Sequence, residues 1–287
     1  MFEISHLPNC KLFVNGVNPK TNKMVERKRP RIALLDISDH VTCFEDDLFR
    51  RNMFQESFCD FKSFFVTKNE WPEGDVVETL TTEFDGVVIS GSDDSCMDDS
   101  LPYIKQMIFL INDLVEMNFP LLGVCFGSQI IIRTLFGNSS VAKSKEVNAM
   151  PEFGVVAIDF TDEQAQQNPL LKGIEKTNVT VAFYITSSHS DVFILKPDDE
   201  KVIPLLKSRW WPHQAYQIKN KWCFGVQFHP EMDKKQTETE IKMAQEDSYP
   251  TLNDDDRMEP DMHVGIIMGK NFCEIASHGS QLFKKND

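Results

Sequence analysis

The sequence predicts an α/β protein built on a doubly wound, mostly parallel β-sheet. From Arg31 to Gly137, short apolar runs of strand length alternate with amphipathic stretches at helical spacing, the pattern of successive βαβ units. The chain of 287 residues is long enough to bury a large core around such a sheet. Beyond residue 150, strand patterns dominate, which predicts additional strands, some antiparallel, beside the parallel core.

The first half of the chain supplies the elements of the parallel core. Apolar runs with the length and composition of buried strands occupy residues 31–37, 61–67, 84–92 and 119–125. Helical spacing of apolar residues occurs over 45–58, 101–118 and 127–137. Pro102 suits the first turn of the second helix, and Gly137 suits the C-terminal end of the third. We therefore expect strands and helices to alternate regularly through this region.

The second half of the chain predicts strands that flank this core. They are expected over 153–160, 177–188, 213–220 and 222–229. Residues 245–261 are acidic and contain proline, which predicts an exposed loop, and residues 262–279 predict a final helix. Residues 1–30 show no regular pattern and are expected to form an irregular N-terminal extension. We interpret residues 31–287 as a single α/β domain.

Charge and hydropathy exclude several classes of function. The chain has 30 basic and 44 acidic side chains, a net charge of −14, whereas binding nucleic-acid phosphates needs a basic surface. No apolar run approaches the roughly 18 residues of a membrane span, and the N-terminus lacks the basic and apolar regions of a secretion signal. Neither nucleic acid nor a membrane is therefore an expected partner.

The cysteines indicate the compartment. Seven cysteines occur without a C-x-x-C pair, which fits a reducing environment better than a disulfide framework. We therefore expect a cytoplasmic protein. Zinc-ligand spacing is absent as well, and neither a metal nor a cofactor is expected.

The stretch "LLGVCFGSQ" at 121–129 places Cys125 between two glycines, after a predicted strand and before a predicted helix. This is the cysteine form of the nucleophile elbow, a tight strand-to-helix turn. The helix N-terminus there favours a thiolate, and the N–H of Phe126 faces the position where an oxyanion would form. On this stretch alone, a nucleophile and a buried structural cysteine remain equally compatible.

A second stretch, "FGVQFHPEMD" at 224–233, provides a candidate base for that cysteine. A predicted strand ends at His229, and Pro230 stops further strand pairing. Glu231 follows two residues later, close enough to hold the imidazole. A nucleophilic cysteine needs both a base and a group that orients it. The pattern therefore favours catalysis over packing for Cys125.

Together, "GVCFGSQ" and "QFHPE" resemble the class I glutamine amidotransferases of the triad type. "DGVVISGS" (85–92) resembles the oxyanion loop of that family, and "SSHSD" (187–191) resembles its substrate-side segment. The resemblance covers roughly residues 31–235. It implies a flavodoxin-like, doubly wound sheet with added antiparallel strands.

The resemblance also implies a role for each matching residue. Cys125 would be the nucleophile, His229 the general acid and base, and Glu231 the residue that orients His229. The oxyanion hole would be formed by the N–H groups of Gly91 and Phe126. The implied substrate-binding residues are Gln129, His189 and Asp191. The reaction would be hydrolysis of a γ-glutamyl amide through a thioester on Cys125.

Three functions remain open at this point. One is a stand-alone hydrolase that acts on a small γ-glutamyl substrate, similar to the plant γ-glutamyl peptidases. The second is a glutaminase subunit that supplies ammonia to a separate synthase, because the 56 residues after Glu231 are too few for a synthase domain. The third is a non-catalytic binding protein that kept the fold.

Two departures from the family pattern bear on substrate choice. Ser128 stands where many relatives carry histidine, and Asp93-Asp94 follow "SGS" where many carry Gly-Pro or Pro. Acidic side chains near a pocket that binds an α-carboxylate would repel it unless they pair with an amine. The two aspartates therefore favour a substrate with an exposed amine.

Overall fold

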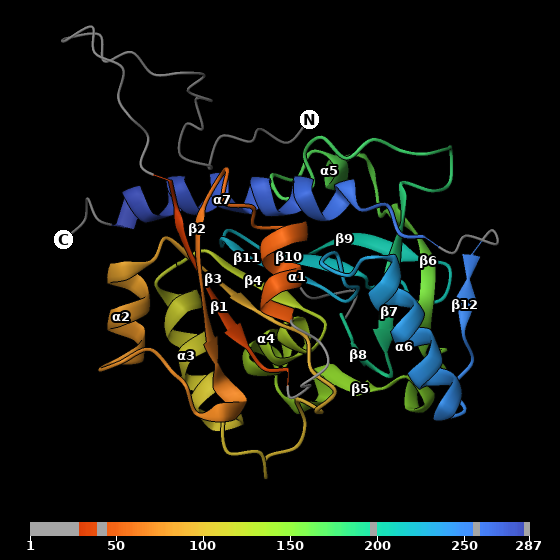
Figure 1. The fold of residues 1–287 in the computed structure, drawn as a ribbon, viewed down its shortest axis with the longest axis horizontal. Helices are drawn as coiled ribbons and strands as arrows, with labels where there is room; N and C mark the ends of the chain where they lie inside the picture. The colour runs from red at the N-terminus through yellow and green to blue at the C-terminus, as the bar shows by residue number, and fades with distance from the viewer. Residues whose placement is uncertain (1–28, 39–44, 196–199, 255–258, 284–287) are drawn as a thin grey trace, which may run out of the picture.

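The computed structural model describes residues 29–38, 45–195, 200–254 and 259–283. Within these residues a ten-stranded sheet has the order β12-β6-β9-β10-β11-β4-β3-β1-β2, and β7 pairs with β6 outside this path. Figure 1 shows this sheet across the middle of the molecule. The N-terminal extension expected over 1–30 lies outside the described residues except at its last two positions.

Five neighbouring strands form the parallel half of the sheet. In spatial order they are β2 (Asp60–Phe65), β1 (Arg31–Asp36), β3 (Gly86–Ile89), β4 (Leu121–Val124) and β11 (Cys223–Val226). Side chains alternate between the faces of a strand. Ile32 and Leu34 accordingly belong to one buried cluster, and Ala33 and Leu35 to the other.

Helices cover both faces of this parallel half, so the predicted doubly wound α/β fold is confirmed. Helices α1 (Glu45–Asn52) and α7 (His263–Phe283) contribute to the first buried cluster. Helices α2 (Val76–Glu83), α3 (Ile104–Glu116) and α4 (Phe126–Phe136) contribute to the second. No helix among the described residues is both long and apolar enough to cross a membrane.

The second half of the chain extends the sheet with antiparallel pairs. β10 (Ala215–Ile218) pairs with β11 and with β9 (Val202–Ser208), and β6 (Glu152–Phe160) pairs with β9 and β7 (Phe183–His189). A separate two-stranded sheet joins β5 (Val141–Lys143) to β8 (Asp191–Phe193). The remaining short elements are α5 (Glu163–Gln166) and the 3-10 turns η1 (Val66–Lys68), η2 (Asn138–Ser140) and η3 (Ser144–Val147).

Helix α1 is shorter than the pattern over 45–58 predicts. It ends at Asn52, and the N–H groups of Met53 and Phe54 both donate to the carbonyl of Phe49. This tight turn directs the Phe54 ring into the core, where it stacks on Phe61 with ring centroids 5.2 Å apart. Burial of one aromatic ring therefore ends the helix before its apolar periodicity does.

The segment expected to be an exposed acidic loop, 245–261, is partly structured, and the expectation is wrong for its middle. Helix α6 (Lys234–Glu246) extends into its start, and β12 (Leu252–Asn253) adds to the edge of β6. Asp254 is buried, and its carboxylate accepts the N–H of Ala157 and pairs with Arg209 at 2.6 Å. Residues 255–258 lie outside the described residues, and α7 begins at His263 and ends at Phe283 rather than at 279.

The first turn of helix α4 packs against the C-terminal end of β3, and Gly127 makes this close approach of the two backbones feasible. A Cβ atom at position 127 would collide with the backbone carbonyl of Ile89 on β3. The N–H of Gly127 also donates to the carbonyl of Ser90 at 3.1 Å. The helix therefore contacts the sheet backbone to backbone at this point.

We expect Gly127→Ala to lower the free energy of unfolding by about 3 kcal/mol, because a central strand cannot move aside for the new methyl group. The midpoint of urea unfolding measures this loss. Gly173→Ala is the control: Gly173 has a positive φ of 89°, but its Cβ would meet nothing within 4 Å, and we expect a loss of about 1 kcal/mol there. Equal losses would mean that the Ile89 contact adds nothing beyond the ordinary cost of replacing a glycine.

Candidate active site

Cys125 occupies a strained turn between β4 and α4. Its backbone has φ 48° and ψ −108°, a region that residues other than glycine rarely adopt. The Cys125 N–H donates to the carbonyl of Val226 at 2.8 Å, which fixes the turn to β11. Ser128, the departure from the family pattern, is fully buried, and its hydroxyl donates to the Cys125 carbonyl at 2.7 Å. The sequence thus forms the elbow that its glycine pattern predicts.

Gly91 lies against both Cys125 and His229. A Cβ atom at position 91 would approach His229 Cε1 to 2.8 Å and Cys125 Cβ to 3.6 Å. Its N–H has no acceptor within the described part of the chain, and Phe126 is the first residue of α4, so its N–H has no acceptor inside that helix. Gly91 packs against Cys125 and Phe126 follows it in the chain, so both N–H groups are candidates for the predicted oxyanion hole.

His229 and Glu231 form a buried pair after the end of β11. His229 Nδ1 lies 2.7 Å from a carboxylate oxygen of Glu231, and Glu231 is fully buried. The N–H of His229 donates to the carbonyl of Thr186 on β7 at 2.8 Å. Asn52, at the end of α1, donates to the Glu231 carbonyl at 2.6 Å. Two separate elements therefore hold this short segment in place.

The pKa of His229 lies well above its ordinary value. Burial alone lowers this pKa, because a charged imidazolium loses hydration. The negative charges of Glu231 and of the Cys125 thiolate, together with hydrogen bonds to both, outweigh burial and raise it. His229 can therefore hold a proton and donate it to a leaving group.

Cys96 is the other cysteine near this centre, and its surroundings keep it protonated. It is fully buried. Burial first, and the Asp191 carboxylate second, raise its pKa to about 12. Since the thiolate is the nucleophilic form, Cys96 does not compete with Cys125.

The three residues expected to bind substrate lie together in the pocket that Cys125 also lines. Gln129 donates from Nε2 to the Asp191 carbonyl at 2.9 Å, and the Asp191 carboxylate accepts the hydroxyl of Ser95 at 2.8 Å. His189 lies two residues before Asp191, at the end of β7. Gln129, His189 and Asp191 all line one pocket with Cys125. The other four predicted residues, Gly91, Phe126, His229 and Glu231, do not line this pocket.

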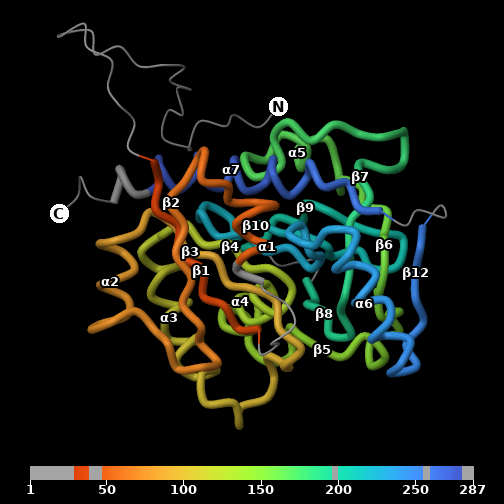
Figure 2. Tube along the Cα trace, viewed as in Figure 1, coloured from red at the N-terminus to blue at the C-terminus, as the bar shows by residue number. Residues whose placement is uncertain are grey.

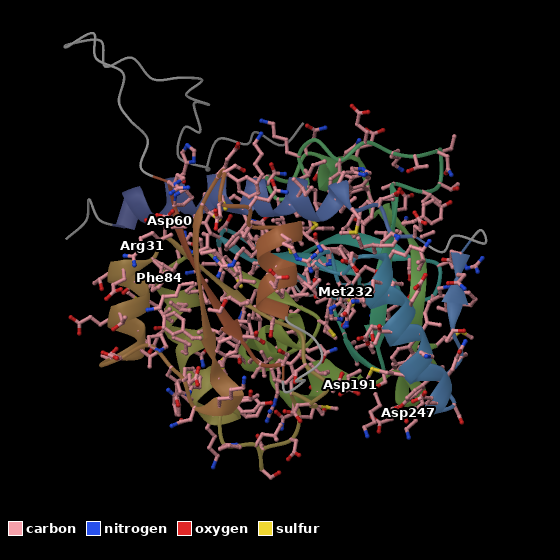
Figure 3. The ribbon with its side chains drawn as sticks, viewed as in Figure 1. Arg31, Asp60, Phe84, Asp191, Met232 and Asp247 are labelled. Atoms are coloured by element: carbon pink, nitrogen blue, oxygen red, sulfur yellow. The ribbon has the colours of Figure 1, made fainter. Side chains whose placement is uncertain are left out.

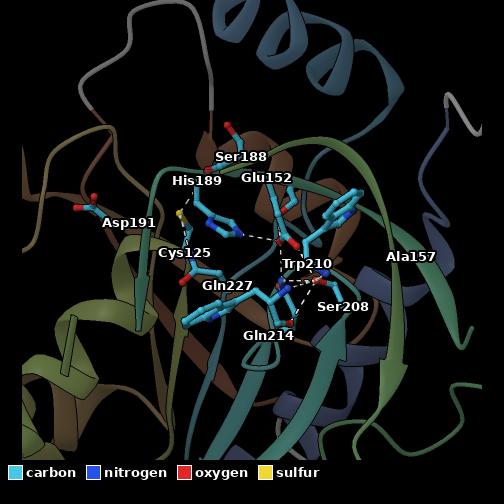
Figure 4. A network of polar contacts seen from close by, with 12 residues as sticks. Cys125, Glu152, Ala157, Ser188, His189, Asp191, Ser208, Trp210, Gln214 and Gln227 are labelled. Carbon is cyan, nitrogen blue, oxygen red and sulfur yellow. Dashed lines mark hydrogen bonds and ion pairs between the residues drawn. The ribbon is translucent and has the colours of Figure 1, made fainter. Parts of the chain in front are cut away.

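Glu152 organises this side of the site, and no local pattern in the sequence marks it. Figure 4 shows its carboxylate at the centre of a polar network. It is fully buried and lies 2.9 Å from His189 Nε2. Its other partners are Ser187 at 3.2 Å, Ser208 at 2.5 Å and Gln214 at 2.6 Å. Four neighbours therefore fix the carboxylate, and the carboxylate fixes the His189 ring.

Gln227 is a further residue that the motifs alone did not single out. Its Nε2 lies 3.8 Å from Cys125 Sγ, and its Oε1 accepts from Gln129 at 3.4 Å. It is the first residue of "QFHPE", so its position in the motif was the available signal. Gln227 thus contacts both Cys125 and Gln129.

The pocket has a volume of about 260 Å³ and is bounded on one side by α6. Figure 2 shows α6 beside β6 and β7. Its residues Glu240, Met243, Ala244 and Asp247 line the pocket, and we name them the α6 wall. The remaining lining residues are Ser92, Asp93, Asp94, Cys125, Gln129, Phe153, Ser188, His189, Ser190, Asp191 and Tyr249.

Curated proteins similar to this chain are much longer than it. GMP synthase (glutamine-hydrolyzing) of Aliivibrio fischeri (strain ATCC 700601 / ES114) is 31% identical over 160 residues, which are 55% of this chain and 26% of that protein. The protein of the same name from Caldanaerobacter subterraneus subsp. tengcongensis is 28% identical over 214 residues, 75% of this chain and 35% of that protein. The chain thus spans about a quarter to a third of the relatives that it matches.

Solved structures share the fold over most of the chain. A GMP synthase subunit protein from Thermoplasma acidophilum has a TM-score of 0.60 at 20% identity, covering 90% of this chain and 98% of that one. A glutamine amidotransferase from Thermotoga maritima has a TM-score of 0.57 at 18% identity, with 90% and 98% covered. The family model "Glutamine amidotransferase class-I" matches residues 52–245, more than half of the sequence. The chain belongs to the class I glutamine amidotransferase family.

Proposed function

We propose that the protein hydrolyses a γ-glutamyl amide through a thioester on Cys125. The observation that carries this proposal is the elbow at Cys125, with the buried His229–Glu231 pair and the Gly91 backbone against it. Nucleophile, base, orienting carboxylate and unpaired N–H groups are the four parts of cysteine-based acyl transfer. Membership of the family supports the same chemistry.

In the first half of the proposed reaction, the Cys125 thiolate attacks the γ-carbonyl carbon and forms a C–S bond. The carbonyl oxygen takes the negative charge and accepts hydrogen bonds from the N–H groups of Gly91 and Phe126. The C–N bond then breaks, and His229 delivers its proton to the leaving nitrogen. A γ-glutamyl thioester remains on Cys125, and an amine or ammonia departs.

In the second half, water attacks the thioester and loses its proton to His229. The tetrahedral species collapses, the C–S bond breaks, and glutamate leaves. Cys125 returns to the thiolate and His229 is again protonated. Glu231 stabilises the imidazolium, which is present at the start of the first half and forms again in the second. A cytoplasmic location suits this chemistry, because the mechanism needs a reduced thiol and the described cysteines are free.

Two substrate types fit this mechanism. The relatives named GMP synthase (glutamine-hydrolyzing) support glutamine as substrate, with ammonia passed to a separate synthase. The pocket of about 260 Å³ extends from Cys125 to residues of α6 and so offers space beyond the γ-glutamyl group. This supports a larger γ-glutamyl amide, such as a γ-glutamyl peptide, cleaved by a stand-alone hydrolase. Glutamate release from glutamine, glutathione and a γ-glutamyl dipeptide separates the two. Turnover of glutamine that appears only with an added synthase would favour the first.

We expect Cys125→Ala to reduce glutamate release at least about 10⁴-fold, because no other group can form the thioester. The fold should survive, since the side chain lost is small, and the thermal unfolding midpoint checks this. Trapping with a γ-glutamyl electrophile should label the native chain on Cys125 and leave the variant unlabelled. Native activity in the variant would remove Cys125 from the mechanism, and a native chain that releases no glutamate and traps no acyl group would favour a binding protein.

Glu231→Gln should move the alkaline limb of the kcat/KM profile to lower pH. The Glu231 charge helps to raise the pKa of His229, so its removal lowers that pKa and His229 loses its proton at a lower pH. Glutamine keeps the size and an acceptor oxygen, so turnover should fall less than in His229→Ala. An unchanged alkaline limb would mean that Glu231 does not set the protonation of His229.

A further inference from the structure

We propose that the pocket selects γ-glutamyl amides whose leaving amine carries a second, positively charged amino group on an aliphatic linker. This inference rests on the proposed hydrolysis at Cys125 and names its substrate class. Three features of the pocket carry it: the charge of its walls, the aromatic side chains at the α6 wall, and an unpaired buried acceptor.

The first feature is the sign of the charges around the pocket. Its lining includes five carboxylates and, among the described residues, no lysine or arginine; the five are Asp93, Asp94, Asp191, Glu240 and Asp247. Figure 3 labels two of them, Asp191 on β8 and Asp247 at the end of α6. Carboxylates from three separate segments thus line the same pocket as Cys125.

Three of these carboxylates accept hydrogen bonds from neutral hydroxyl groups. The Asp94 carboxylate accepts from the Tyr103 hydroxyl at 2.5 Å, and Glu240 accepts from the Ser188 hydroxyl at 2.8 Å. Asp191 likewise bonds the Ser95 hydroxyl. Neutral donors of this kind orient a carboxylate but leave its charge in place. A bound cation would meet an attractive potential, and a bound anion a repulsive one.

The second feature is an aromatic pair beside the α6 wall. Phe153 on β6 and Tyr249 lie with ring centroids 4.9 Å apart, and both line the pocket. The Tyr249 N–H donates to the Ala244 carbonyl at 2.8 Å, which brings the ring back along the end of α6. Tyr249 remains 39% exposed and Met243 37%. Aromatic faces and carboxylates together are the usual surroundings of a bound ammonium group.

The spacing on α6 places charge and apolar surface on one face. Glu240, Met243, Ala244 and Asp247 follow the i, i+3, i+4, i+7 pattern of a single helix face. An aliphatic linker can therefore lie along Met243 while its terminal ammonium meets Glu240 or Asp247. The leaving group of glutamine is ammonia, which has no linker to place there, whereas a larger leaving amine does.

The third feature is His189, whose side chain is 1% exposed. Its Nε2 faces the Glu152 carboxylate, and its Nδ1 has no hydrogen-bond partner within the described residues. With the ring proton on Nε2, Nδ1 is an acceptor at the pocket lining. An unpaired buried acceptor is satisfied by an N–H donor from a ligand. His189 therefore adds one neutral acceptor to the carboxylates that line the pocket.

Three matched amides test the proposal through glutamate release. The γ-glutamyl amide of 1,4-diaminobutane carries an ammonium group, the amide of n-pentylamine replaces it with a methyl group, and the amide of 4-aminobutyrate carries a carboxylate. We expect kcat/KM for the ammonium compound to exceed that for the pentyl compound by about tenfold, and the carboxylate compound to react most slowly. The preference should shrink as salt is added.

Glu240→Gln and Asp247→Asn should each reduce the ratio of kcat/KM between the ammonium and pentyl amides toward one. The Gln substitution keeps an acceptor for Ser188, so it removes charge without removing that hydrogen bond. Glu238→Gln is the matched control, because Glu238 lies on the same helix but is exposed and outside the pocket lining; its ratio should equal that of the native chain.

Binding to the Cys125→Ser variant, measured by calorimetry with the same three amides, reports charge selection without turnover. Tighter binding of the ammonium compound, reduced by Glu240→Gln, supports the proposal even where the hydrolysis assay fails. Equal affinities and equal kcat/KM for the ammonium and pentyl amides would overturn it while leaving hydrolysis at Cys125 intact. A preference that persists unchanged in both α6 variants would also overturn it, since the charge would then be read elsewhere.

Discussion

The structure depends on one close approach, that of the first turn of α4 to the ends of the parallel strands. Gly127 brings the helix backbone against Ile89 of β3, and Cys125 turns through a positive φ because no relaxed residue could join β4 to a helix placed so near. The hydrogen bond from Cys125 to Val226 fixes the same turn to β11. Three neighbouring strands thus end around a single side chain, and the loops that follow β3 and β11 bring Gly91 and His229 to it.

Two buried carboxylate–imidazole pairs flank that side chain, and they differ in what they do. Glu231 lies 2.7 Å from His229 and raises its pKa, and in the proposed mechanism His229 gives its proton to the leaving nitrogen. Glu152 holds His189 at 2.9 Å, with its free nitrogen at the pocket lining. Strand β7 connects the pairs, because Thr186 bonds the His229 backbone and the strand ends at His189. A shift of β7 would therefore disturb the acid and the substrate wall together.

The parts of the fold and site that the sequence predicts are those with local signatures. Buried strands are short apolar runs, so the parallel core follows from the pattern, and Cys125 and His229 lie in compact motifs. Glu152 could not be found this way, because it is a single acid at the start of an apolar strand and its partners come from β7, β9 and the segment before β10. Helix α6 was missed because it is polar, with only Thr237 and Ala244 buried; the cap at Asp233 was its one local sign.

In the proposed mechanism, the division between the two halves of the sheet corresponds to a division between reaction and recognition. The parallel half supplies the elbow at Cys125 and the strand that precedes His229. The antiparallel half and α6 supply the walls, and there the chain concentrates carboxylates beside Phe153 and Tyr249. In the proposed function, the negative potential of this lining favours a cationic leaving amine over a neutral or anionic one, and such a difference in affinity is what electrostatic selectivity requires.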